Sequence, residues 1–178
     1  MEQTAAILLR KMPWSETSLI VTWLTEGFGT VRTVARGARR PKSEFAGALD
    51  LFYGADISFS INRKGDLHTL REVSLKTTFN VSGAGNAGFY LASYFGELAG
   101  IAAPSMQPAP GIFDLLRRGM NFVQQAPATV KALNHFETEL CRILGVHDPA
   151  GEVPAIDALA SLYGVIPASR AVMLKFFE

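Results

Sequence analysis

Residues 17–36, with the sequence TSLIVTWLTEGFGTVRTVAR, contain two strand-like segments separated by a glycine-rich turn. Residues 17–25 are rich in β-branched and aromatic side chains, which favour an extended backbone. Gly27-Phe28-Gly29 is a turn signal, and residues 30–36 follow with a mixed alternation of apolar and polar side chains. The stretch therefore predicts two strands joined by a short turn.

Three further strand-like segments flank this pair: Thr4–Arg10, Leu49–Ile61 and Leu67–Leu75. The last two are separated by Arg63-Lys64-Gly65-Asp66, which has the composition of a hairpin turn. No convincing helix interrupts the first three strands. Five strands within about 76 residues predict a small closed barrel rather than a βαβ unit.

The second half of the chain has the periodicity of helices. A small, polar and glycine-rich connector, residues 81–86, precedes a change in apolar period from two to about 3.6. Helices are predicted over residues 87–102, from Pro110-Gly111 onward, and over a third segment whose apolar face runs from Leu133 to Leu144 and ends at Gly145. Pro154 and Pro167 are placed where further short helices could start. The fold class predicted is α+β with two domains, a barrel over residues 1–80 and a helical domain over residues 81–178.

Composition indicates a folded protein of a reducing compartment. Apolar residues make up 48% of the 178 residues and charged residues 19%, which suits a chain with a real core. The early apolar run from Ala5 to Leu9 is too short for a signal peptide or a membrane span. Cys141 is the only cysteine, so no internal disulfide can form. We expect a cytoplasmic, nucleoid-associated protein without membrane contact.

The residue types that carry catalysis or bind metals are scattered. His68, His135 and His147 do not lie at metal-ligand spacing with a carboxylate or with Cys141, and each is better explained as a structural or surface histidine. The glycines at 83, 85 and 88 resemble a dinucleotide motif only superficially, because the βαβ context is missing. We expect no catalytic residue, no metal and no cofactor, and hence a protein that is not an enzyme.

The most basic segment is Arg32–Lys42, RTVARGARRPK, which contains no acidic residue. Residues 1–76 carry eleven Lys and Arg against eight Asp and Glu, whereas residues 77–178 carry six against eight. Gly37 and Pro41 break regular pairing, so the arginines between them should lie on a loop where guanidinium groups can bind phosphates. The simpler explanation of the same charges is a solvated loop.

Residues 34–52, VARGARRPKSEFAGALDLF, closely resemble the signature of the RecO family of DNA repair proteins. The similarity extends to IVTWLTEGFGTVRTV (20–34), GDLHTLREV (65–73), GFYLASYFGEL (88–98) and FETELCRILG (136–145). The resemblance implies an oligonucleotide-binding (OB) barrel followed by a helical domain. It also implies a recombination mediator that binds single- and double-stranded DNA, anneals strands and engages the C-terminal tail of single-stranded DNA-binding protein. With RecR, such a protein helps RecA load on the coated strand.

Two features depart from the family pattern. Many members carry a four-cysteine zinc motif after the third helix of the C-terminal half, and residues 147–156 contain no cysteine here. Zinc is therefore not expected. The sequence stops at residue 178, so we expect an abbreviated helical domain and a less complete RecR-contacting surface.

Two groups of residues are candidates for binding, one for DNA and one for a partner peptide. The expected DNA footprint has Arg36, Arg39, Arg40 and Lys42 at its centre, Arg32, Arg10 and Lys11 beside them, and Phe28 and Phe45 as exposed base-stacking rings. The tail peptide is expected to meet Arg117, Arg118 and Arg142; pairing of the first two with Asp114, Glu137 or Glu139 explains them equally well. The main functional alternative is an OB-fold adaptor that prefers RNA.

Overall fold

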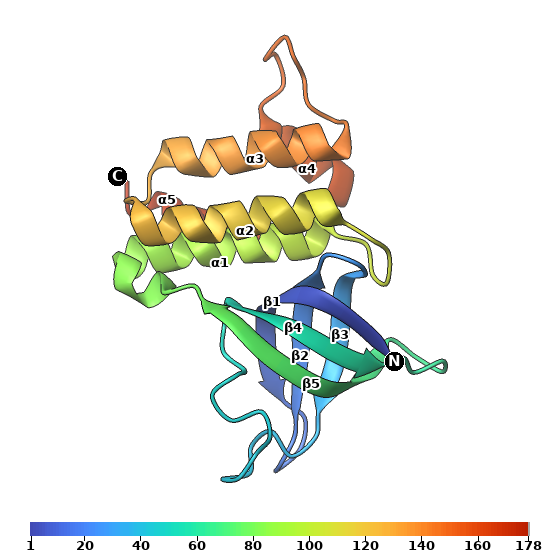
Figure 1. The fold of residues 1–178 in the computed structure, drawn as a ribbon. Coiled ribbons are helices and arrows are strands. Elements are labelled where there is room, and N and C mark those ends of the chain that lie inside the picture. Colours follow the sequence, from blue (N-terminus) through green and yellow to red (C-terminus); the bar gives the residue numbers. More distant parts are fainter. Residues whose placement is uncertain (178) are drawn as a thin grey trace. The chain divides into compact units, whose positions relative to one another are not determined.

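Five strands close into a barrel in the computed structural model, which describes residues 1–177 (Figure 1). The strands are β1 (Glu2–Pro13), β2 (Leu19–Thr25), β3 (Gly29–Ala35), β4 (Tyr53–Ser60) and β5 (Leu67–Thr78). Their order around the barrel is β1-β2-β3-β5-β4, and only the β3–β5 pair is parallel. This is the five-stranded arrangement of an OB fold, so the predicted barrel is confirmed.

The interior of the barrel is filled by alternate side chains of every strand. Trp23, Ile57 and Phe59 are at most 1% exposed, and the remaining core residues come from neighbouring registers of all five strands. The indole Nε1 of Trp23 donates to Thr33 Oγ1 at 2.9 Å, which satisfies the one polar atom that this ring buries. Because side chains alternate across a strand, Arg32, which lies between the buried Val31 and Thr33, projects from the outer face of the barrel into solvent.

A later segment of the chain, residues 103–113, packs with the strands as part of the same compact unit. The backbone of Thr30 donates to Pro104 O at 3.0 Å and accepts from Met106 N at 3.3 Å. Gly29 must be glycine at this contact: its φ is +57°, and a Cβ would lie 2.0 Å from the Pro104 carbonyl oxygen. The turn predicted at residues 27–29 thus also receives a distant part of the chain.

The other described residues, Asn80–Ala102 and 114–177, form a helical unit, and the helix that starts at residue 110 therefore begins in the barrel unit. A 3-10 turn, η1 (Val81–Ala84), precedes five helices: α1 (Gly85–Ala102), α2 (Pro110–Gln125), α3 (Val130–Leu144), α4 (Ala155–Tyr163) and α5 (Ser169–Leu174). Thr129 Oγ1 accepts from Ala132 N at the start of α3, and Gly145 ends α3 in the left-handed conformation. The helices predicted from periodicity, including the short ones after Pro154 and Pro167, are confirmed.

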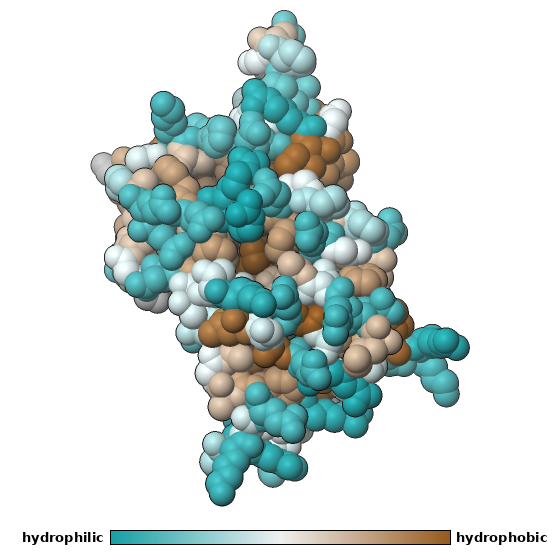
Figure 2. Space-filling model, in the orientation of Figure 1, coloured by the Kyte–Doolittle hydropathy of each residue, from teal (hydrophilic) through white to brown (hydrophobic). Residues whose placement is uncertain are grey.

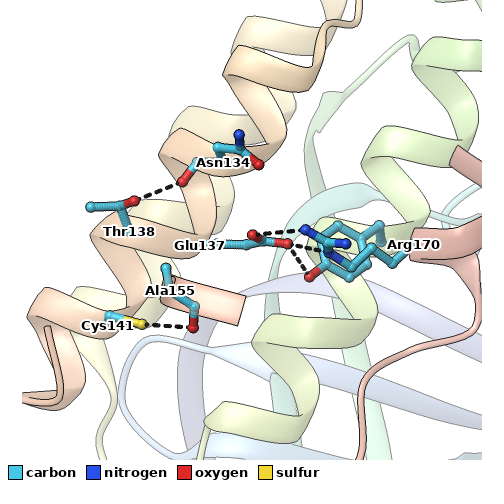
Figure 3. A network of polar contacts seen from close by, with 7 residues as sticks. Asn134, Glu137, Thr138, Cys141, Ala155 and Arg170 are labelled. Atoms are coloured by element: carbon cyan, nitrogen blue, oxygen red, sulfur yellow. Dashed lines mark hydrogen bonds and ion pairs between the residues drawn. The ribbon is translucent and has the colours of Figure 1, made fainter. Parts of the chain in front are cut away.

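The core of the helical unit contains a stacked pair of aromatic rings and a buried network of polar side chains. The rings of Phe95 and Phe136 stack with centroids 4.0 Å apart. Glu137, which is 2% exposed, accepts from Tyr94 Oη at 2.7 Å and from Arg170 Nε at 2.6 Å (Figure 3). This network joins α1, α3 and α5. Within residues 1–177, no helix is both long and apolar enough to cross a membrane.

Candidate nucleic-acid interface

A cleft in the barrel unit lies between the β1–β2 loop (residues 14–18) and the β4–β5 loop (residues 61–66). Its volume is about 890 Å³, and its walls include serine, threonine and asparagine side chains as well as Trp14 and Ile61. Of the described residues 1–177, the charged ones that line it are Arg36, Arg40 and Arg71, and none of its lining residues is acidic. In OB folds these two loops are the ones that contact oligonucleotides.

The three arginines of the cleft are available to bind an anion. Arg71 Nε donates to Ser60 Oγ at 2.9 Å, which orients the guanidinium group toward the cleft wall. Among residues 1–177, no carboxylate lies within ion-pair distance of Arg36, Arg40 or Arg71. Unpaired guanidinium groups that face a polar cleft are suited to phosphate oxygens, which they bind with two parallel hydrogen bonds.

The β3–β4 loop (residues 36–52) is tied to the β1–β2 loop by Arg39. The Arg39 amide donates to Thr17 O at 3.0 Å, and its guanidinium donates to Ser15 O at 2.8 Å. Gly37 has a φ of +72° and accepts from Arg40 N at 3.0 Å, so the chain turns directly after β3. The prediction that Arg39 and Arg40 lie on a loop that leaves a strand is confirmed. Hydrophilic residues cover the exposed barrel loops in the space-filling view (Figure 2).

The structure brings only some of the predicted DNA-contacting residues to the cleft. Arg36 and Arg40 line it, Arg39 joins two of its loops, and Lys42 is exposed farther along the β3–β4 loop. Arg10 is exposed on β1.

Two predicted cations instead form ion pairs. Arg32 Nη1 lies 2.6 Å from Asp66, and Lys11 Nζ lies 2.7 Å from Asp50. The hydrogen bond from Lys11 is the main reason that the pKa of Asp50 is below its ordinary value. Pairing with a carboxylate lowers the charge that either cation offers to a phosphate.

The expectation that Phe28 and Phe45 are exposed is wrong. Phe45 is 7% exposed and belongs to the barrel core. Phe28 is half-buried, and its ring packs edge-on against Phe59 with centroids 5.5 Å apart. Small barrels need aromatic volume inside, and these rings supply it. The exposed ring is Trp14, which is 60% exposed and lines the cleft.

Sequence reasoning did not select Trp14 and Arg71 for the site. A signal for Trp14 was present, because it is followed by the polar sequence Ser-Glu-Thr-Ser, which is typical of a loop. Arg71 alternates with the buried Leu70 on β5 and was therefore recognisable as outward-facing. Its position beside Ser60 depends on strand pairing between β4 and β5, which the local sequence does not specify.

A second concave site lies within the helical unit, between α2 and α3. It has a volume of about 500 Å³ and an apolar floor that includes Phe95, Leu115 and Phe136. Arg118, Lys131 and His135 are the basic residues that line it.

Of the three arginines predicted to meet a partner peptide, only Arg118 lines this groove. Arg117 and Arg118 both pair with Asp114, at 2.6 and 2.9 Å, and Arg142 pairs with Glu139. Hydrogen bonds from Arg117 and then Arg118 hold the pKa of Asp114 below its ordinary value. Pairing with Asp114, the alternative explanation of these arginines, is what the structure shows.

The described residues 1–177 contain no group of three or more His, Cys, Asp or Glu side chains that could hold a metal ion. Cys141 is buried, as predicted, and its thiol donates to the carbonyl oxygen of Ala155 at 3.4 Å (Figure 3). Burial raises the pKa of this thiol above its ordinary value, which disfavours the nucleophilic thiolate.

Comparison with known proteins agrees with this architecture. Residues 1–79 match the model of the N-terminal domain of recombination protein O. The protein of Rhodopirellula baltica named DNA repair protein RecO is 34% identical to this chain. The aligned region covers 82% of this chain and 53% of that relative. The protein of the same name from Anaeromyxobacter dehalogenans is 32% identical, over 86% of this chain and 58% of that relative. The protein of the same name from Salinibacter ruber is 30% identical, over 92% of this chain and 63% of that relative.

Residues 1–79 are a RecO N-terminal domain, and the similarity to RecO proteins extends over most of the chain. The chain spans between about half and two thirds of the length of these curated RecO relatives. The match to the N-terminal model covers all five strands of the barrel, together with the cleft and its three arginines.

Proposed function

We propose that this chain acts in DNA repair and recombination by binding single- and double-stranded DNA through the barrel cleft. The proposal includes annealing of complementary strands and, together with RecR, assistance to RecA on DNA coated by single-stranded DNA-binding protein. It rests on the names of the relatives and on the chemistry of the cleft. Binding to chromosomal DNA would place the protein at the nucleoid, in a role that involves no catalysis.

The main support for the proposal is that, among residues 1–177, most of the positive side chains without a carboxylate partner belong to the barrel half of the chain. Of the eleven Lys and Arg residues in the first 79, three pair with carboxylates: Lys11, Arg32 and Lys76. The helical half has six such residues, of which Arg117, Arg118, Arg142 and Arg170 are paired. Phosphate binding depends on cations that can release the counterions of DNA. The barrel therefore offers most of this charge.

A salt-dependent titration with DNA tests the proposal. The double variant Arg36→Ala/Arg40→Ala should bind both an oligonucleotide and a duplex more weakly. The slope of log affinity against log salt should fall by about 0.7–0.9 for each phosphate that the variant no longer neutralises. Arg117→Ala, which removes a cation already paired with Asp114, is the matched control and should keep the wild-type slope. Wild-type affinity and slope in the double variant would contradict the cleft as the DNA site.

Competition with RNA addresses the functional alternative. An OB-fold adaptor that prefers RNA would lose its bound DNA to an equimolar RNA of the same sequence. The proposed repair function predicts that DNA is retained. Neither nucleic acid should be cleaved or modified during the titration, because the proposed role is binding.

We also propose that the groove between α2 and α3 receives the C-terminal tail of single-stranded DNA-binding protein. An apolar floor with Arg118, Lys131 and His135 around it suits an acidic peptide that ends in an aromatic residue and a carboxylate. In solution, Lys131→Ala and Arg118→Ala should each weaken binding of a tail peptide by about 1–3 kcal/mol. Arg142→Ala, whose cation lies outside the groove, is the control. Unchanged affinity in both groove variants would place the peptide elsewhere.

A further inference from the structure

The two tryptophans of the chain have opposite environments. Trp23 is 0% exposed in the barrel core, whereas Trp14 is 60% exposed on the β1–β2 loop. Tryptophan is usually well buried because its ring is the largest apolar group in proteins. An indole left in solvent at the wall of a polar cleft is therefore a candidate for contact with a ligand.

The loop that carries Trp14 is held in a defined conformation. The amides of Trp14 and Ser15 donate to Ser18 O at 3.0 and 3.3 Å, and Ser18 N donates to Ser15 Oγ at 3.2 Å. Arg39 adds two hydrogen bonds to the same loop, at Ser15 O and Thr17 O. A ring presented by an ordered loop loses little conformational freedom when a ligand binds to it.

The surroundings of Trp14 are suited to a nucleotide strand. Arg36, Arg40 and Arg71 line the same cleft without carboxylate partners, so the cleft combines an apolar ring with anion-binding groups. The side chains of Ser60, Asn62 and Thr69 add hydrogen-bonding groups. Its volume of about 890 Å³ lies within the ~300–1,000 Å³ of typical ligand sites.

We propose that Trp14 stacks on an unpaired base and gives the cleft a preference for single-stranded over double-stranded DNA. This inference rests on the proposed DNA-binding function and assigns strand discrimination to one residue. In a duplex both faces of each base are covered by neighbouring bases, so only a base that has left the stack can offer a face to the indole. Phosphates, in contrast, are presented by both forms of DNA, and the arginines should bind both.

The test compares a single-stranded oligonucleotide with a blunt-ended duplex, which contains no unpaired base. Trp14→Ala should lower affinity for the oligonucleotide by roughly 5- to 150-fold, the range expected for one stacked base. Its affinity for the duplex should stay within about twofold of wild type. Trp14→Phe, which keeps an aromatic face, should recover most of the single-strand affinity. Arg36→Ala/Arg40→Ala is the matched comparison and should weaken both DNA forms together. Because Trp14 is exposed, its variants should keep the wild-type unfolding midpoint, which is measured alongside.

Tryptophan fluorescence gives an independent readout. Stacking of a base on Trp14 should quench the emission of the wild-type protein on titration with an oligonucleotide, while the buried Trp23 stays unaffected. The quenching should be absent from Trp14→Phe and from a titration with the duplex.

Three results would overturn the inference. Equal losses of affinity for oligonucleotide and duplex in Trp14→Ala would show that the ring only shapes the loop. Full single-strand affinity in Trp14→Ala, with weaker binding in Arg36→Ala/Arg40→Ala, would reject the stacking role and leave the proposed function in place. Unchanged binding in all of these variants would reject both the inference and the cleft as the DNA site.

Discussion

Glu137 shows how one residue can organise the helical unit. Its carboxylate is buried, and it accepts hydrogen bonds from Tyr94 on α1 and from Arg170 on α5 (Figure 3). A carboxylate in such surroundings is tolerated only when its charge is compensated and its oxygens are hydrogen-bonded. Burial and the Glu137 charge together raise the pKa of Tyr94 well above its ordinary value, so the phenol remains the donor. The network therefore fixes α5 against α1 and α3.

Removal of Arg170 should be costly because Glu137 would remain buried without its cation. We expect Arg170→Ala to lower the free energy of unfolding by about 3 kcal/mol. The control is Arg142→Ala, which breaks an exposed pair with Glu139 on α3 and should cost less than about 1 kcal/mol. Urea unfolding of both variants measures the difference, and similar destabilisation of the two would contradict a special role for the buried pair.

His68 predicts a dependence of stability on pH. It is 3% exposed, its Nδ1 accepts from the Asn62 amide at 3.1 Å, and burial lowers its pKa below the ordinary value despite the opposing charge of Asp66. The folded state therefore prefers neutral imidazole. Its contribution to stability should be present above pH ~6.5, the pKa of the unfolded chain, and should be lost as the pH falls below that value through the lower pKa of the folded state. In His68→Gln, unfolding free energies at about pH 7.5 and about pH 5 should differ less than in wild type, and an identical difference would count against this assignment.

At the scale of elements, the turn between β2 and β3 is constrained both by its backbone conformation and by a close contact. Gly29 combines a positive φ with close approach of the Pro104 carbonyl oxygen. Gly47, in the β3–β4 loop, also has a positive φ, of +73°, but nothing lies within 4 Å of the place where a Cβ would be built. A comparison of substitutions at the two glycines therefore distinguishes the cost of a left-handed backbone from the cost of a steric clash.

We expect Gly47→Ala to cost about 1–2 kcal/mol, the usual penalty of a left-handed L-residue. Gly29→Ala should cost clearly more, because its Cβ would also displace the backbone at Pro104. Thermal or urea unfolding of the pair measures the difference. Equal destabilisation would mean that the contact between residues 29 and 104 adds no constraint.

The elements that local sequence predicted are those with a strong period. The apolar faces of α2 and α3 predict burial directly, since every side chain on one face meets the same core, and the β-branched and aromatic side chains of residues 17–25 predict a strand by their composition. The short η1 turn was not separated from the connector before α1, because four residues carry no period. Packing of residues 103–113 on the turn before β3 was equally invisible, because it joins positions more than 70 residues apart.

At the scale of the whole molecule, local sequence predicted one part of the candidate site, and the other part depends on how the whole chain folds. The basic loop after β3 was predicted from composition, and the RecO resemblance of residues 34–52 was confirmed by the family match. Which cations stay unpaired was not predictable: Arg32 finds Asp66 and Lys11 finds Asp50, each across more than 30 residues. Phe45 was predicted to be exposed, but Trp14 is the exposed ring. This too depends on the whole fold, because closure of the barrel decides which aromatic side chains it encloses.

Hydrogen exchange of the whole chain, with and without a bound single-stranded oligonucleotide, locates the DNA footprint without any substitution. Slower exchange is expected in the three loops that surround the cleft, residues 14–18, 36–42 and 61–66, because their amides would be shielded by the strand. The helical unit should exchange at its free rate. Protection confined to α2 and α3, or to the outer surface of β1 and β4, would contradict DNA binding by the cleft.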